Sequence, residues 1–541
     1  MQLSVDEYLV QFLQLHLFFE IALGTTAVAV LHNVVGLKTY GTFGAVIVAV
    51  SMLVAGPLLG FLIFTGLLAA VIVSRAAIAR EGIQGSHRVA ILVTMVAIAA
   101  VGTAVLGLTS ATPALAYVVL FPILITAWFA ERFVEDVSRE GGYKGIRTMA
   151  FTFVAVVVAY AVMLQHPLVL FVIHNPLSWA GLVLLNWFLG TRVRFRFSER
   201  FRFRGTATDG DDVDLAGTVL TMNRRNRDYI DRYNPSGLLA TLDKARVKSL
   251  LVPLGVPMPE TYLLVRGRRD LPRAEALIDR LQAFVVKPAS SYGGEGILLV
   301  RGRAGDRYRV NGHIETKAQL LKHLRRIVDG EFNDGKSDVV ILEELLVQDP
   351  SLDPLSPEGV ADIRVVTLLG HPVMAMARLP TRSSRGRANL HSGAVGAGID
   401  LSTGRLTSAV WNGERVEVHP DTGVPIRGFR IPRWAELLEI ASEAQEASGL
   451  GFAGVDIVLD ARHGPTLLEV NRRPGLEIQN ANRAGLLPRL RAIEARAISA
   501  APPERRVQVS LDLNAREWGT SSKAVPGPAP PSGVFPPANG R

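Results

Sequence analysis

The stretch GVDIVLDARHGPTLLEVN, residues 454–471, decides the fold of the C-terminal part of the chain. Its two apolar runs, 454–459 and 465–471, are typical of neighbouring strands in one sheet. Residues i and i+2 of a strand face the same side, so Glu469 and Asn471 point together. Asp456 lies 469 − 456 = 13 positions before Glu469 and can join them from the adjacent strand.

Three oxygen ligands on a rigid sheet suit Mg²⁺, which binds through few carboxylates plus nucleotide phosphates. The alternative is the polar, solvent-facing side of an edge hairpin. Earlier parts of the sequence favour the metal interpretation, because they supply groups that suit the phosphates.

A glycine-rich loop precedes this stretch. The run FVVKP (284–288) predicts a buried strand that carries Lys287, and SSYGGEG (290–296) leads to a second strand at 297–300. Glycines let backbone N–H groups approach phosphates closely, and a lysine adds a point charge. An ordinary hairpin remains the alternative. The loop is neither a Walker A sequence nor a Rossmann turn.

Three further segments lie between the loop and the acidic strands. They are an apolar strand at 339–346 that contains Glu343 and Glu344, the tripeptide Asp362-Ile363-Arg364, and a polar, glycine-punctuated segment at 387–396. This order of motifs resembles the ATP-grasp superfamily and, within it, the glutamate-ligase-related (RimK-like) branch. Residues 222–230 and 233–235 look like the opening of that branch, and the resemblance covers 215–488.

The resemblance implies an α+β ATP-grasp fold and a role for each matching residue. ATP would be held by two lysines, a glycine flap, a hinge, a ribose acceptor and a polar loop: Lys244, Lys287, Gly293, Gly294, Gly296, Glu344, Leu345, Asp362, Arg387 and Asn389. Asp456, Glu469 and Asn471 would hold Mg²⁺ or Mn²⁺. Arg364 and Arg473 would stabilise an acyl phosphate or a substrate carboxylate.

One position departs from the pattern of the RimK-type enzymes. Arg472-Arg473 follows the metal-type asparagine, where small residues are common in those enzymes. This departure puts a glutamate substrate in doubt. It suggests either a more anionic acceptor or a salt-bridged surface.

The first 190 residues predict a membrane domain. Crossing the hydrocarbon core takes about 20 apolar residues. Residues 42–74, 89–108, 114–130, 148–164 and 167–190 contain no charged residue. Gly56-Pro57 could divide the first stretch, and residues 18–35 form a weaker candidate because Glu20 and His32 interrupt them. The sequence therefore predicts an α-helical transmembrane bundle of five to seven spans, and its start lacks the basic region of a cleaved signal peptide.

Basic and uncharged loops alternate between these stretches. Loops 75–88 and 131–147 and the segment after Gly190 carry Lys or Arg, whereas 109–113 and 165–166 carry none. The positive-inside rule then places everything after Gly190 in the cytoplasm, with the chain in the inner membrane. The strip 192–204 alternates arginine with apolar residues. It could hold anionic headgroups, or it could be a stop-transfer flank or a strand.

Polar residues inside the last apolar stretch are a default functional hypothesis. His174 and Asn175, which precede Pro176, could instead mark a helix break, and Asn186 lies further along the same stretch.

Composition agrees with a membrane protein. The chain has 541 residues, of which 49% are hydrophobic, and its mean hydropathy is +0.26. These values exclude a single soluble globule and a disordered chain. The absence of cysteine excludes disulfides, thiolate nucleophiles and Cys metal sites. We expect a membrane domain at 1–190, a basic linker at 191–214, an ATP-grasp ligase domain at 215–498 and a disordered Pro/Ala/Gly-rich tail at 499–541.

The expected function is that of a membrane-tethered, ATP-dependent carboxylate–amine ligase that forms a carbon–nitrogen bond through an acyl phosphate. One alternative is a transporter or sensor whose ATP-grasp domain only binds nucleotide. Another is an ATP-grasp phosphoryl transferase or sugar-modifying enzyme. The lipid bilayer is the one expected partner. No nucleic acid is expected, and the sequence names neither substrate nor the oligomeric state.

Overall fold

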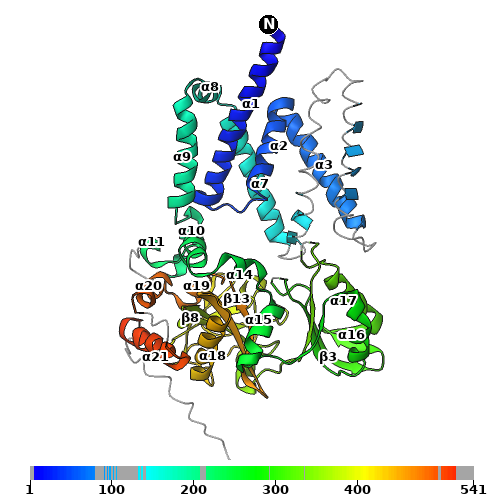
Figure 1. Cartoon of the computed structure of the whole chain (residues 1–541), viewed down its shortest axis with the longest axis vertical. Coiled ribbons are helices and arrows are strands. Elements are labelled where there is room, and N and C mark those ends of the chain that lie inside the picture. Colours follow the sequence, from blue (N-terminus) through cyan, green and yellow to red (C-terminus); the bar gives the residue numbers. More distant parts are fainter. Residues whose placement is uncertain are drawn as a thin grey trace, which may run out of the picture.

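The computed structural model describes residues 5–78, 142–206, 215–291, 293–333, 335–496 and 501–518, together with scattered residues between 90 and 137. A bundle of helices stands at one end of the molecule, and an α+β part with two β-sheets lies at the other (Figure 1). The predicted fold class is confirmed: an N-terminal helical region is followed by an α+β domain.

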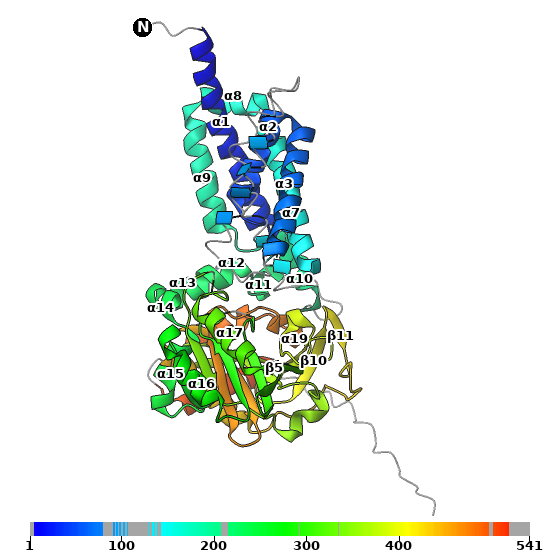
Figure 2. The same cartoon turned by 90° about the vertical axis from the view of Figure 1, so that its right-hand side faces the viewer.

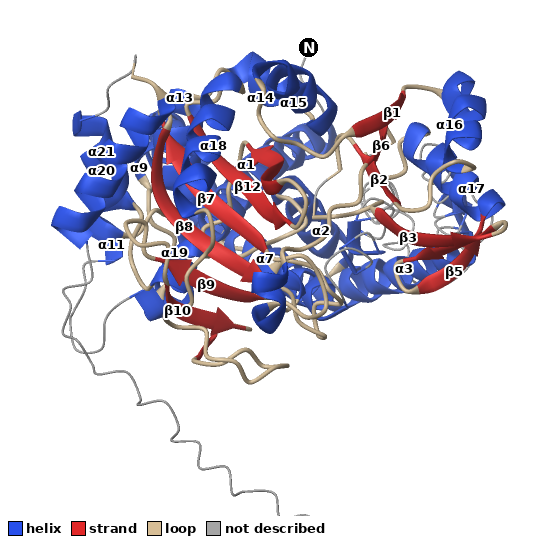
Figure 3. Ribbon diagram, turned by 90° about the horizontal axis from the view of Figure 1, so that it is seen from below, coloured by secondary structure: helices blue, strands red, loops and turns tan. Residues whose placement is uncertain are grey.

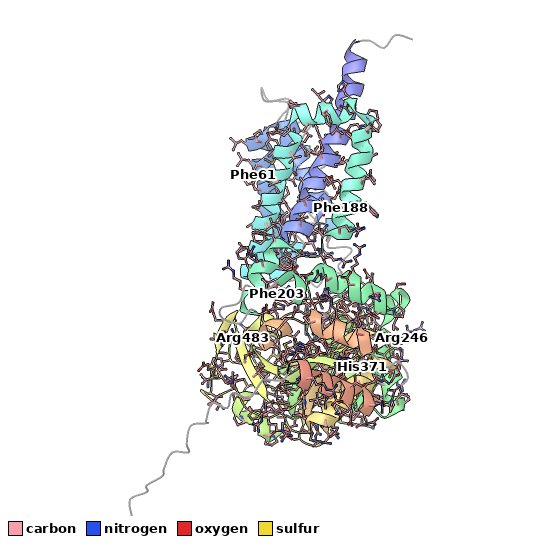
Figure 4. All side chains as sticks on the ribbon, turned by 90° about the vertical axis from the view of Figure 1, so that its left-hand side faces the viewer. Phe61, Phe188, Phe203, Arg246, His371 and Arg483 are labelled. Atoms are coloured by element: carbon pink, nitrogen blue, oxygen red, sulfur yellow. The ribbon has the colours of Figure 1, made fainter. Side chains whose placement is uncertain are left out.

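The described helices of the bundle are α1 (Val5–Val30), the π-helical turn η1 (Leu31–Val35), α2 (Thr42–Ala55), α3 (Pro57–Ile78), α7 (Gly142–Met163), α8 (His166–His174) and α9 (Pro176–Arg192). Three described segments, in α1–η1, α3 and α7, are long and apolar enough to cross a membrane, or four if the bent pair that begins with α8 is one span. Large apolar side chains of the bundle are exposed, among them Leu58 and Leu177. Phe188 of α9 is exposed as well and is labelled in Figure 4. Outward-facing apolar side chains are what a lipid environment requires.

Two of the predicted helix breaks are present. Gly56, at φ +87°, separates α2 from α3, and Pro57 then begins α3. Helix α8 ends at His174, and Asn175 separates it from the helical segment Pro176–Arg202. The two segments are bent by 108° relative to each other. His174-Asn175-Pro176 is therefore a helix break, as one of the two interpretations predicted. Most of the predicted spans 89–108 and 114–130 lie outside the described residues.

Short helices connect the bundle to the sheets, and most of them lie between the two in Figure 2. They are α10 (Phe197–Arg202), η3 (Arg204–Thr206), α11 (Leu215–Thr218), α12 (Met222–Arg224), the π-helical turn η4 (Arg225–Ile230), α13 (Asp231–Tyr233) and α14 (Ser236–Thr241). The arginine-rich strip thus contains a helix rather than a strand. Glu199 provides the local reason, because its carboxylate accepts from the N–H of Arg196 and completes a capping box.

The first sheet has the strand order β1-β6-β2-β3-β4-β5, and every pair is antiparallel. Its strands are β1 (Thr261–Val265), β2 (Phe284–Pro288), β3 (Leu298–Ala304), β4 (Arg307–Val310), β5 (His313–Thr316) and β6 (Val340–Glu343). Helices α16 (Leu271–Ile278) and α17 (Lys317–Val328) cover one face, where Leu320, Leu324 and Ile327 are fully buried (Figure 3). Helices α15 (Lys244–Leu251) and η5 (Val252–Leu254) precede β1, and η6 (Arg268–Asp270) lies between β1 and α16.

The second sheet has the order β11-β10-β9-β8-β7-β12-β13, also antiparallel throughout. Its strands are β7 (Asp362–Leu368), β8 (His371–Leu379), β9 (Val395–Ile399), β10 (Leu406–Trp411), β11 (Glu414–Val416), β12 (Phe452–Asp460) and β13 (Gly464–Asn471). Around it lie η7 (Pro350–Leu355), η8 (Leu390–Ser392), α18 (Trp434–Ala447), α19 (Ile478–Asn482) and α20 (Leu487–Arg496).

Both faces of the second sheet are buried. Ile363 and Val365 pack with Leu437 and Leu438 of α18 on one face. Val366 and the other alternate residues of β7 and β8 pack on the opposite face with residues of the connecting segment and of α19 and α20, among them Phe203, Leu220, Tyr229, Ile478 and Leu490. The connecting segment below the bundle therefore covers one face of this sheet.

The C-terminal region differs from the predicted tail. The tail was expected to begin at 499, but α21 (Pro503–Leu513) and the π-helical turn η9 (Asn514–Trp518) form there. Val507 and Leu513 are buried in two different core clusters of the second sheet, so burial of apolar side chains holds this segment in place. Residues 519–541 lie outside the described residues.

Candidate functional site

Asp456, Glu469 and Asn471, called the acidic trio below although Asn471 is an amide, are arranged as their spacing predicts. Strands β12 and β13 pair antiparallel, with Asp456 directly opposite Glu469 and Gly454 opposite Asn471. The three side chains of the trio therefore share one face of the sheet. Glu469 and Asn471 are half-buried, and Asp456 is buried.

Two arginines hold Asp456. Arg364 of β7 donates Nε–H to Oδ1 at 2.7 Å and Nη2–H to Oδ2 at 2.5 Å, and Arg378 of β8 donates to Oδ2 at 2.8 Å. These arginines hold the pKa of Asp456 below its usual value, despite the burial that opposes them. A carboxylate offers about four lone-pair sites, and three are used here. Oδ1 can accept one further bond, which leaves room for one bond to a cation.

The glycine-rich loop lies next to a lysine from a different element. Lys244, the first residue of α15, donates from Nζ to the carbonyl of Ser291 at 2.6 Å. Burial lowers the pKa of Lys244, and the carboxylate of Glu469 on β13 opposes that shift. Lys244 is therefore within electrostatic reach of both the loop and the acidic trio.

The loop itself has two features that suit an anion. Gly293, Gly294 and Gly296 have positive φ angles, and a side chain on Gly296 would meet Pro288 Cγ at 2.6 Å. The Ser291 hydroxyl is buried and has no hydrogen-bond partner among the residues that the structure describes. An unpaired buried hydroxyl beside a lysine and a glycine-rich loop can donate to a phosphate oxygen.

A family comparison covers the part of the chain that carries the lysine, the loop and the acidic trio. Residues 224–495 match the family model described as sugar-transfer associated ATP-grasp, which is half of the chain. The chain belongs to this ATP-grasp family. Residues 1–207 match a second model, described as seven transmembrane helices usually fused to an inactive transglutaminase. The N-terminal part is thus a membrane domain, here followed by an ATP-grasp domain.

Several solved structures are similar to part of the chain. The ligase PsnB complexed with its minimal precursor is 17% identical, with a TM-score of 0.26, over 49% of this chain and 63% of that one. D-cycloserine synthetase DcsG is 16% identical, with a TM-score of 0.29, over 55% and 92%. D-alanine–D-alanine ligase from Bacillus anthracis is 16% identical, with a TM-score of 0.25, over 51% and 66%. The chain thus spans about 60% of the length of PsnB, and no curated protein matches it.

Within the ATP-grasp domain, Lys287 is buried rather than open. Its Nζ lies 2.5 Å from Oε1 of Glu343, and Nζ of Lys248 lies 2.5 Å from Oε2 of the same carboxylate. Burial lowers the pKa of Lys248, and Glu343 opposes that shift. Lys287 could still reach a phosphate, but in this structure its charge is paired with Glu343.

The predicted hinge has side-chain partners of its own. Glu344 contacts Arg462 at 2.9 Å and His463 at 3.0 Å, and Arg462 also donates to the carbonyl of Leu345 at 2.9 Å. The hinge therefore lies next to the turn that joins β12 to β13. The Glu344 carboxylate is thus paired, the backbone N–H of Glu344 donates to the carbonyl of Glu260 at 2.9 Å, and the adenine contact through the hinge backbone stays a prediction.

Asp362, the predicted ribose acceptor, is paired with an arginine. Its carboxylate is buried and accepts from Nε and Nη2 of Arg378. Burial raises the pKa of Asp362, and the arginine opposes the shift. In this structure two of the four lone-pair sites of the Asp362 carboxylate are used by Arg378, and its contact with a ribose hydroxyl stays a prediction.

The remaining predicted residues lie in loops. Asn389 caps η8 by accepting from the N–H of His391, and Arg387 is exposed. Across the described ranges, no hydrogen bond or ion pair joins the side chain of Arg387 or Asn389 to the acidic trio. Arg473 is also exposed, and its N–H donates to Oδ1 of Asn471 at 2.9 Å. Arg473 therefore directly adjoins the trio, and the contact of Arg387 and Asn389 with the triphosphate stays a prediction.

Sequence reasoning missed three charged residues of this region: Lys248, Arg378 and Asp338. Lys248 follows Lys244 by one helical turn, which is a usable signal. Arg378 is the cross-strand partner of Asp362, which only the strand register reveals. Asp338 accepts from the N–H of Ser290 at the base of the loop. Within the described ranges no group of three His, Cys, Asp or Glu side chains could hold a metal ion, and the acidic trio includes an amide.

Proposed function

We propose that this chain is a membrane-tethered, ATP-dependent carboxylate–amine ligase that uses Mg²⁺ and works through an acyl phosphate. The observation that carries the proposal is the position of Lys244. It donates to the glycine-rich loop of one sheet and lies within electrostatic reach of Glu469 on the other. Groups suited to phosphates and groups suited to a divalent cation therefore meet between the two sheets.

The fit of the site to Mg²⁺ and ATP rests on oxygen ligands for the cation and on N–H and O–H donors for the phosphates. Oε1 and Oε2 of Glu469, Oδ1 of Asp456 and the amide oxygen of Asn471 would hold Mg²⁺, which neutralises charge on the phosphates when bound. Lys244, the Ser291 hydroxyl and the loop backbone would hold phosphate oxygens. Lys287 would join them if its pairing with Glu343 loosens or is shared.

The proposed reaction has two steps. In the first, a carboxylate oxygen of the substrate attacks the γ-phosphorus of ATP, the bond between that phosphorus and the bridging oxygen breaks, and ADP leaves. In the second, an amine attacks the acyl carbon, phosphate leaves with the bonding electron pair, and the amine loses a proton. Arg473 would orient the carboxylate and stabilise the charge on the acyl phosphate, and Arg364 would contribute only through Nη1, because its Nε and Nη2 hold Asp456.

The test is product formation by the full chain. Purified protein in detergent is supplied with ATP, Mg²⁺ and panels of carboxylates and amines, and ADP and products are followed by mass spectrometry. We expect ADP formation that depends on both a carboxylate and an amine, with a product whose mass equals their sum minus water. ADP formation that needs no amine would contradict the proposal.

The family description favours a second candidate. The matching family is described as sugar-transfer associated, so an ATP-grasp enzyme that modifies a sugar is the alternative. Such an enzyme would give ADP with a sugar acceptor and no amine. The same experiment with sugars in place of amines distinguishes the two. The glutamate-ligase branch remains a finer prediction about the acceptor, and Arg472-Arg473 argues for a more anionic one.

The orientation of the membrane domain is a separate prediction. Because basic residues occupy alternate loops, we expect the ATP-grasp domain to be cytoplasmic. A green fluorescent protein fused after Arg204 should fluoresce, whereas alkaline phosphatase fused at the same residue should be inactive. Active phosphatase there would reverse the orientation and separate the site from cytoplasmic ATP.

A further inference from the structure

Four arginines from separate segments converge where the membrane domain meets the ATP-grasp domain. Arg196 precedes α10, Arg202 ends it, Arg225 begins η4, and Arg473 follows β13. Burial first, and then the positive charges of Arg202, Arg473 and Arg196, lower the pKa of Arg225 to about 10. We call these four residues the junction arginines.

Arg225 forms the buried centre of the junction arginines. Its side chain is 7% exposed, and Nη1–H donates to the carbonyl of Pro474 at 3.0 Å, while Nε and Nη2 donate to Asn226. Its described hydrogen-bond partners are neutral oxygens, so no anion offsets its charge directly. A buried guanidinium without a carboxylate partner costs free energy that a bound anion would recover.

The acids nearby only partly balance the junction arginines. The carboxylate of Glu477 forms an ion pair with Arg202, with Oε1 lying 2.8 Å from Nη2. Glu199 accepts from two backbone N–H groups, those of Arg196 at 3.0 Å and Met222 at 2.6 Å. Four arginines against two acids leave 4 − 2 = +2. Arg473 is exposed and makes no ion pair with a described residue, so its guanidinium is available to a ligand.

The junction arginines are continuous with the reacting end of the candidate site. Arg473 lies two residues after Asn471, and its N–H bonds to the Asn471 amide oxygen. A side chain on Gly475 would meet Arg364 Nη1 at 3.9 Å, and one on Gly454 would meet Pro474 Cβ at 2.8 Å. The loop 473–475 therefore packs directly on the arginine that holds Asp456. A ligand on Arg473 would lie beside the proposed acyl phosphate.

One of the junction arginines, Arg196, is linked to the ends of the membrane helices. Arg196 donates from Nε to the amide oxygen of Asn223 at 3.0 Å. The Asn223 amide donates in turn to the carbonyls of Asn33, after α1, and Val193, after α9. These contacts place the cluster directly below the bundle, where α10 and α12 lie in Figure 2. A lipid headgroup at the membrane surface would meet this cluster.

We propose that the junction arginines bind the headgroup of an anionic phospholipid in the same bilayer, and that a primary amine carried by such a headgroup is the acceptor of the reaction. Arginine is the side chain best matched to phosphate, because its planar donors bind two oxygens at once. The identity of the acceptor rests on the proposed function, whereas binding of the headgroup does not.

Binding is tested on the full chain in detergent without ATP. Isothermal titration calorimetry with dihexanoyl phosphatidic acid measures the lipid phosphate, and dihexanoyl phosphatidylcholine and inorganic phosphate are the comparison probes. We expect phosphatidic acid to bind at least tenfold more tightly than either. Arg473→Gln and Arg202→Gln should each weaken that binding at least tenfold. The matched control is Arg268→Gln, which removes an exposed arginine of η6 that pairs with Asp329 after α17. This control should not change the affinity for phosphatidic acid.

The outcomes separate the sources of the anion. Equal affinity for inorganic phosphate would show a site for a free anion and overturn the lipid assignment. Equal affinity for phosphatidylcholine, or wild-type affinity in both Arg473→Gln and Arg202→Gln, would also overturn it. Arg225→Gln is not used alone, because the loss of a buried side chain that holds Pro474 can unfold the region. Phosphatidic acid binding without amine-dependent ADP formation would contradict the ligase proposal and leave the headgroup site standing.

Discussion

Replacing Glu469 with glutamine is expected to lower Mg²⁺-dependent ADP formation by about a hundredfold or more, with little effect on the fold. The change keeps the shape of the side chain and removes a charge from a site for a hard cation. Even residues that only support metal ligands typically cost 10- to 100-fold when replaced, so loss of a direct ligand should cost at least about as much. ADP release by wild type and variant is measured across a Mg²⁺ titration.

The control for Glu469→Gln is Glu436→Gln on α18. Glu436 pairs with Arg433 on the surface and lies outside the candidate site. We expect wild-type ADP formation in this control, and both variants should keep a melting temperature close to that of the wild type. Equal rates and equal Mg²⁺ dependence in wild type and Glu469→Gln would show that the trio is only the polar face of a hairpin, and the ligase proposal would lose its metal site.

Glu343→Gln should have the largest effect on stability. Glu343 is buried, and its carboxylate lies 2.5 Å from the amino groups of both Lys248 and Lys287. Without the negative charge, two buried ammonium groups lose the carboxylate that both of them contact. Removing one member of a buried ionic group typically costs about 3–5 kcal/mol. We expect a clearly lower unfolding midpoint for the full chain in detergent, followed by tryptophan fluorescence.

The comparison for Glu343→Gln is Glu331→Gln, which breaks an exposed pair with Arg326. Exposed ion pairs contribute about 0–1 kcal/mol, so this variant should unfold close to the wild-type midpoint. If both variants have the same unfolding midpoint, the charges of the lysines near Glu343 are neutralised by other groups. The buried cluster of Glu343, Lys248 and Lys287 then does not stabilise the first sheet.

The metal-type stretch was the part of the site that sequence predicted best. Its geometry depends on local rules: a strand period of two and a turn short enough to pair neighbouring strands. Asp456, Glu469 and Asn471 therefore lie where the spacing placed them. The break at Gly56-Pro57 was predictable for the same reason, since proline and glycine act on the local backbone.

The other residues depend on contacts that local rules do not describe. Strands β7 and β12 are buried on both faces, so their sequences do not alternate, and the face of Asp362 could not be read from the pattern. Its partner Arg378 becomes visible only when β8 pairs with β7. Lys287 was expected to face phosphate alone, but its pairing with Glu343 requires β2 beside β6. The helix at 503–518 was missed because the prolines before it resemble the start of a tail.

Helix α21 has a consequence for how the chain is made. The ring Nδ1 of His371 in β8 bonds to the carbonyl of Arg506 in α21 across 135 residues of sequence. At the usual 5–20 residues per second of synthesis, a ribosome needs on the order of ten seconds to deliver α21 after β8 emerges. During that interval the nascent strand lacks its final cover, while the membrane helices, which were translated earlier, can already insert. The bundle would thus anchor the unfinished sheet at the bilayer, and the chain would be completed from its membrane end toward its last helix.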